Sequence, residues 1–153
     1  MANALVTLSD KVTSEIQDLI RLNIDSAEGF TAAADLIEDK SLASQFREYA
    51  AQRSANAEEL KATVAYNGEE PAQSGTTSGT LHRWWLELKG KVTSGSSHQV
   101  LSEAERGEDS IKQRYERAIK ECAGSPVSDL LTRQYSGVKA THDRIRDLRD
   151  ATK

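Results

Sequence analysis

Apolar residues recur at three- and four-residue steps along four long stretches of the chain, and this spacing restricts its fold more than any other feature. The stretches cover residues 10–38, 42–66, 98–122 and 126–151. Such a period places the apolar side chains on one face of a helix, and that face must be buried against other helices. Because no segment has the alternation typical of a strand, the sequence predicts an all-α protein.

The segments between these stretches predict the connections. Residues 39–41 are too few to do more than reverse the chain, whereas residues 68–78 are turn-rich and long enough to cross the bundle. The crossover then leads into a short helix over residues 81–92. The prediction is a single domain over residues 1–153, an antiparallel four-helix bundle whose long crossover carries a short accessory helix.

Two helix starts are predicted from capping residues. Ser41 is the expected N-cap of the second long helix, because its hydroxyl can accept a hydrogen bond from the first turn. Ser125 is the expected N-cap of the last helix, with Pro126 at its first position.

Each of the four predicted helices carries one polar residue on its apolar stripe: Asn23, Arg53, Glu108 and His142. All four lie well inside their helices, so they can approach a common level of the bundle. Burying a carboxylate costs free energy unless a cation or a hydrogen-bond donor pairs with it. We therefore expect a Glu108–Arg53 ion pair, with His142 and Asn23 completing its hydrogen bonds, and no cofactor. Such a layer fixes helix register more than it adds stability.

A metal site is the alternative for the same layer. Helical bundles hold iron or manganese with inward glutamates and Glu-x-x-His pairs. The candidate ligands here are Glu108 and His142, joined by Glu28 beside the stripe of the first helix and by Glu105 one turn before Glu108.

Three positions depart from that ligand pattern. The second helix has Arg53 and Asn56 where glutamate and histidine are needed, and the fourth has Lys139 where glutamate is needed. A fixed positive charge repels a divalent metal and also satisfies the carboxylate that would bind it. The ion pair is therefore the preferred interpretation.

The net charge and the first residues of the chain bear on its partners and its location. Twenty basic against twenty-four acidic residues give a formal net charge of −4, with the signs mixed along the chain. This balance does not favour binding to nucleic acid or to a membrane surface. The first residues show no charged region followed by an apolar run, so a cytoplasmic protein is expected.

Trp84 and Trp85 form an apolar patch typical of an interface, and they predict a homodimer.

Several segments together resemble an uncharacterised bacterial family of ferritin-like four-helix bundles, a domain of unknown function. They are EIQDLIRLNIDSAEGFTAAA from residue 15, LHRWWLELK from 81, SEAERGEDS from 102 with the following Tyr115, and THDRIRDLRD from 141. The resemblance implies a ferritin-like architecture, with the long crossover between the second and third long helices, and no established activity. Compared with the rubrerythrin-like proteins, Glu108 resembles the Gly-Glu ligand of the third helix and His142 the ligand of the fourth.

The sequence thus predicts a non-enzymatic, soluble helical bundle, and the family resemblance implies a stress-related or scaffolding role for it. The alternative is a ferritin-like protein that binds metal or handles oxidants with Glu28, Glu108 and His142. The two differ in the chemistry at residue 53.

Overall fold

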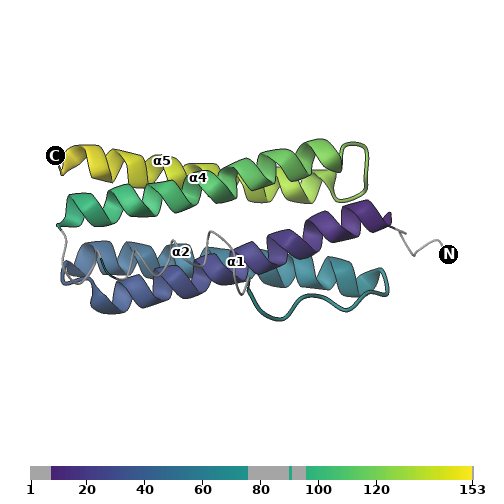
Figure 1. Ribbon diagram of the computed structural model, residues 1–153, viewed down its shortest axis with the longest axis horizontal. Helices are drawn as coiled ribbons and strands as arrows, with labels where there is room; N and C mark the ends of the chain where they lie inside the picture. The colour runs from purple at the N-terminus through teal and green to yellow at the C-terminus, as the bar shows by residue number, and fades with distance from the viewer. Residues whose placement is uncertain (1–7, 76–89, 91–95, 153) are drawn as a thin grey trace.

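Four long helices account for most of the computed structural model, which describes residues 8–75, 90 and 96–152 (Figure 1). They are α1 (Asp10–Leu36), α2 (Lys40–Tyr66), α4 (Ser97–Glu121) and α5 (Ser128–Ala151). The described residues contain no strand, so the prediction of an all-α, four-helix protein is confirmed. None of the described helices is both long and apolar enough to cross a membrane.

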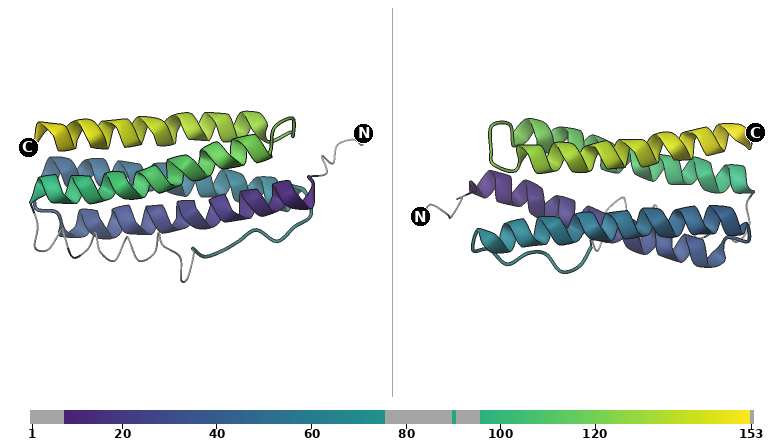
Figure 2. Two further views of the ribbon diagram at one scale, coloured as in Figure 1. Left: turned by 45° about the horizontal axis from the view of Figure 1, so that its top comes forward. Right: turned by 180° about the vertical axis from the view of Figure 1, so that it is seen from behind.

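The helices are arranged as two hairpins. α1 packs along α2, and α4 packs along α5, while the two hairpins lie against each other (Figures 1 and 2). α2 and α4 begin at the same end of the molecule, where the C-terminus also lies. The chain between them must therefore return along the length of the bundle.

The first part of this return, residues 68–75, lies along α1 (Figure 2). The side-chain amide of Gln17 binds it twice: Nε2 donates to the carbonyl of Glu70 at 2.7 Å, and Oε1 accepts from the N–H of Ala72 at 2.8 Å. A Cβ at Gly75 would overlap the carboxylate of Asp25, so a larger residue there requires this side chain to move. Of the predicted accessory helix over residues 81–92, Gly90 alone is described; Trp84 and Trp85 lie outside the described residues.

The start of α2 differs from its prediction. Asp39 is the N-cap, and its Oδ1 accepts from the N–H of Leu42 at 3.0 Å. Ser41 lies inside the first turn instead. Asp39 is preferred over Ser41 as the N-cap because its charged carboxylate also interacts favourably with the positive end of the helix dipole.

The start of α5 also differs. The helix begins at Ser128, two residues after Pro126, and no side chain caps it. The carbonyl of Ser125 accepts from the N–H of Ser128 at 3.2 Å, in a turn that precedes the helix. Gly124, with φ +80°, reverses the chain just before this turn, so the residues up to Val127 complete the connection.

The core lies between the two hairpins and is built from the apolar stripes. Its larger members are Val12, Ile16, Leu19, Ile20 and Phe30 of α1; Leu42, Phe46, Tyr49, Leu60 and Val64 of α2; Leu101, Ile111 and Tyr115 of α4; and Leu131, Val138 and Ile145 of α5. Phe30 and Phe46 pack edge to face, with ring centroids 5.2 Å apart.

Candidate functional site

The centre of the bundle contains an ion pair between the two hairpins. Nη2 of Arg53 on α2 donates to Oε2 of Glu108 on α4 at 2.8 Å, and the two side chains are 1% and 0% exposed. The ring of Phe30 lies over the guanidinium, with the centroid 6.0 Å from Cζ. Burial raises the pKa of Glu108, and the positive charge of Arg53 opposes that rise.

Each member of this pair keeps one polar atom unused. Within the described residues, Nη1 of Arg53 and Oε1 of Glu108 are buried and have no hydrogen-bond partner. We expected His142 and Asn23 to complete these bonds, and that expectation is wrong, because both side chains bind other groups.

Asn23 belongs to a second polar layer, to which every described helix contributes one residue. Its Nδ2 donates to the hydroxyl of Tyr115 at 2.8 Å, and that hydroxyl donates to Oε1 of Gln134 at 2.8 Å. Asn56 donates to Oδ1 of Asn23 at 3.4 Å, and Gln134 donates to the backbone carbonyl of Asn56 at 3.3 Å. Burial raises the pKa of Tyr115 to about 12.

The sequence predicted only Asn23 as an inward polar residue of this layer, and Asn56 was noted only where a metal site would need histidine. Tyr115 lies on the apolar stripe and counted there as a hydrophobic residue, and Gln134 was not singled out. The usable signal was the hydroxyl of a tyrosine in the middle of a buried stripe, since a buried hydroxyl needs a partner.

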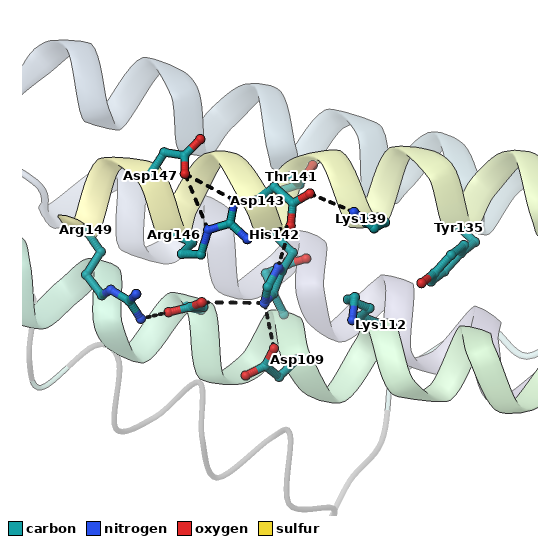
Figure 3. Close-up of polar contacts among 12 residues, drawn as sticks. Asp109, Lys112, Tyr135, Lys139, Thr141, His142, Asp143, Arg146, Asp147 and Arg149 are labelled. Carbon is teal, nitrogen blue, oxygen red and sulfur yellow. Dashed lines mark hydrogen bonds and ion pairs between the residues drawn. The ribbon is translucent and has the colours of Figure 1, made fainter. Parts of the chain in front are cut away.

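His142 lies nearer the surface, where it joins α4 to α5 (Figure 3). Its Nε2 is 2.6 Å from Oδ1 of Asp109 and 3.6 Å from Oε2 of Glu105, and its Nδ1 is 3.1 Å from Oδ1 of Asp143. Hydrogen bonds from Lys139 and His142 lower the pKa of Asp143 to about 2. Both ring nitrogens thus face carboxylate oxygens, and the ring links Asp109 of α4 to Asp143 of α5.

Of the four candidate metal ligands, the structure brings only Glu105 and His142 within 4 Å of each other, at 3.6 Å. Glu28 is exposed on α1, Glu108 is paired with Arg53, and Glu105 forms an ion pair with Arg149. Across residues 8–75 and 96–152, no three His, Cys, Asp or Glu side chains are grouped so that they could hold a metal ion.

A sequence model of one family, described as a domain of unknown function (DUF2383), matches residues 11–121. This match covers more than half of the chain. The chain belongs to the DUF2383 family. The resemblance to an uncharacterised domain family is thereby confirmed. No curated protein matches the chain.

The matched region of this DUF2383 chain extends from the start of α1 to the end of α4. It therefore contains Arg53, Glu108, Asn23 and Tyr115, whereas His142 lies beyond it on α5. The ion pair thus falls entirely within the family domain.

Proposed function

We propose that this DUF2383 protein is a non-enzymatic bundle of ferritin-like, antiparallel architecture, in which the Arg53–Glu108 ion pair occupies the place of a metal centre. Its role is that of a scaffold in the bacterial cytoplasm, with the stress-related setting that the sequence resemblance implies. The observation that carries this proposal is the buried 2.8 Å contact between Arg53 and Glu108.

The chemistry of Arg53 supports this reading. A guanidinium stays protonated under ordinary conditions, so Arg53 cannot release Glu108 by losing a proton. A divalent ion at this level would face a fixed cation 2.8 Å from the carboxylate that should bind it. Asn56, one turn further along α2, is engaged with Asn23. The interior is therefore suited to hold the helices in register and poorly suited to bind a metal.

Charged contacts between the hairpins support a scaffold of fixed shape. Arg114 of α4 binds two acidic residues of α1, with Nη1 donating to Glu15 at 2.8 Å and Nη2 donating to Asp18 at 2.9 Å. Arg133 of α5 binds Glu59 of α2 through both terminal nitrogens, at 3.2 and 2.7 Å. Forked contacts of this kind fix orientation as well as distance.

Elemental analysis tests the proposal. The protein is purified without chelator and measured as isolated, after incubation with ferrous iron, and after incubation with manganese. We expect well below one metal atom per chain in every case. Near-stoichiometric metal that disappears in Glu108→Ala would overturn the proposal and favour the metal-handling alternative.

The same proposal includes a homodimer formed through Trp84 and Trp85. Sedimentation velocity of Trp85→Ala is expected to show a lower sedimentation coefficient than the wild type. Tyr66→Ala is the matched control, because Tyr66 is a large aromatic side chain, 55% exposed, at the end of α2. A wild type that sediments as a monomer, or a dimer that only Tyr66→Ala disrupts, would contradict this interface.

A further inference from the structure

The end of α2 carries the dipeptide Asn67-Gly68. Of the four asparagines in the sequence, Asn67 alone precedes a glycine. Because glycine has no Cβ to shield its backbone nitrogen, this nitrogen approaches the carboxamide of the preceding side chain more easily than in any other residue. Asn67 is therefore the asparagine with the least obstructed route to deamidation.

The reaction is intramolecular. The backbone nitrogen of Gly68 loses its proton and bonds to Cγ of Asn67, the Cγ–Nδ2 bond breaks, and Nδ2 leaves with a proton as ammonia. The product is a five-membered cyclic imide. Water then opens this ring at either carbonyl and leaves aspartate or isoaspartate at residue 67.

The fold holds both reacting groups away from this ring closure. Asn67 is the C-cap of α2 with ψ 13°, so the nitrogen of Gly68 lies on the side of the backbone nitrogen of Asn67 and away from its side chain. The N–H of Gly68 donates to the carbonyl of Ala65 at 3.0 Å. Nδ2 of Asn67, the leaving group, donates to the carbonyl of Thr63 at 2.9 Å. Ring closure must therefore break both hydrogen bonds and rotate the peptide plane between the two residues.

The carboxamide oxygen of Asn67 adds a third restraint. Oδ1 is buried and has no hydrogen-bond partner among the described residues. Asn67 also borders a cavity of about 330 Å³ whose lining is mainly apolar and includes Leu8, Val127 and Leu130. The negative charge that develops on Oδ1 during the attack finds no donor there, and such a charge away from water costs free energy. The last turn of α2 must therefore open before Asn67 reacts.

The aspartate product fits this position poorly. A carboxylate at residue 67 lies at the C-terminal end of α2, where the helix dipole is negative, and the exposed Glu69 and Glu70 follow directly. It also has no proton to donate to the carbonyl of Thr63, as Nδ2 does in the unmodified chain. The converted chain thus loses one hydrogen bond of the turn and gains charge repulsion.

We propose that Asn67 is a deamidation site controlled by the last turn of α2, residues 63–67. Asn67 reacts when this turn opens, and the product keeps the turn from closing as tightly as before. Because the connector of residues 68–75 begins at this turn, deamidation loosens its attachment irreversibly. This inference goes beyond the scaffold role and does not depend on it.

Peptide mapping by mass spectrometry tests the site. The full chain is incubated in mildly alkaline buffer, either folded or in guanidinium chloride, and each asparagine is followed over several weeks. We expect Asn67 to convert in the denatured chain and at least about tenfold more slowly in the folded protein, because only molecules with an open last turn react. Asn23 and Asn56, which precede Ile24 and Ala57, are internal controls and are expected to stay unmodified in both.

Two variants test the effect of the product. Asn67→Asp reproduces the aspartate form, and Asn67→Ala removes the side-chain hydrogen bond without adding charge. We expect the hydrogen-exchange protection of the Gly68 and Glu69 amides, which donate to Ala65 and Val64, to be several-fold lower in Asn67→Asp than in Asn67→Ala. Circular dichroism checks that both variants retain the helical fold.

Three outcomes would overturn the proposal. Equal conversion of Asn67 in the folded and denatured chain would show that the turn gives no control. Absence of conversion at Asn67 in the denatured chain, or faster conversion at Asn23 or Asn56, would show that Asn67 is not the site. Equal amide protection in the two variants would show that the carboxylate does not loosen the turn.

Discussion

The guanidinium of Arg53 and the carboxylate of Glu108 lie 2.8 Å apart in the interior, on helices that belong to different hairpins. Neither side chain is more than 1% exposed. Both charges have therefore lost their water, and each depends on the other for compensation. Loss of one partner therefore costs more stability in this pair than in the exposed ion pairs on the surface.

Replacing Arg53 with methionine leaves Glu108 buried without its counter-charge. We expect Arg53→Met to lower the free energy of unfolding by about 3–5 kcal/mol, as measured by urea denaturation. In the double variant Arg53→Met/Glu108→Leu both charges are gone, and most of this loss is expected to be recovered.

The control for this prediction is Arg47→Met. Arg47 and Asp35 form an ion pair whose side chains are 55% and 65% exposed, and such pairs contribute about 0–1 kcal/mol. If Arg53→Met is no more destabilising than Arg47→Met, the buried pair is not formed in solution.

Removing the hydroxyl of Tyr115 tests the second polar layer. Tyr115→Phe leaves Oε1 of Gln134 without its donor and removes one acceptor from Asn23. We expect a loss of about 1–3 kcal/mol in unfolding free energy, because these groups stay buried. Tyr135→Phe is the matched control: its hydroxyl binds Glu116 at a more exposed position, so its loss is expected to cost less than about 1 kcal/mol. Equal costs would argue against the layer.

Alkaline pH provides an independent test of the same tyrosine. Burial raises the pKa of Tyr115 to about 12, while the unfolded chain has the ordinary value of about 10. Below pH ~10 both states are protonated, and the contribution of Tyr115 to stability is fully present. Between pH ~10 and ~12 the unfolded chain loses this proton first, so stability falls as the pH rises.

Urea denaturation of the wild type and of Tyr115→Phe from pH ~8 to ~11 measures this effect. The stability difference between the two proteins is expected to shrink above pH ~10, because the phenylalanine variant has no phenol to ionise. Titration of the remaining groups is common to both proteins. A difference that stays constant with pH would show that Tyr115 ionises equally in both states.

The connector after α2 depends on one side chain of α1. Gln17→Ala removes the bonds to the carbonyl of Glu70 and the N–H of Ala72. We expect proteases to cut within residues 68–75 several times faster, because local release exposes this backbone without global unfolding. Gln113→Ala, at an exposed position of α4, is the control. Identical cleavage rates in the two variants would mean that Gln17 does not hold the connector.

Helix existence and the inward faces were predictable because they depend on a period that is local in the sequence. The stripe of α4, for example, places Glu108 between Ala104 and Ile111, and all three are buried. The ion pair could be proposed for the same reason: Arg53 and Glu108 were the only charges of opposite sign on the four chosen stripe positions. The starts of α2 and α5 were misplaced because several residues near each end were able to cap or to turn the chain.

The partners of Asn23 and His142 could not be predicted in this way. The helical period identifies a face, but it leaves the axial position of one helix against the next undefined, and one turn is ~5.4 Å, well beyond hydrogen-bond reach. Asn23 thus meets Tyr115 rather than the ion pair, and His142 meets Asp109 and Asp143.

The sequence by itself determined that the chain is helical, which face of each helix is buried, and that a carboxylate in the interior requires a cation. Only the tertiary structure decided which polar groups share a level and which ones remain unpartnered. The physical reason is that the first set depends on the order of residues along one helix. The second depends on how two hairpins settle against each other, and this follows from the packing of the whole core.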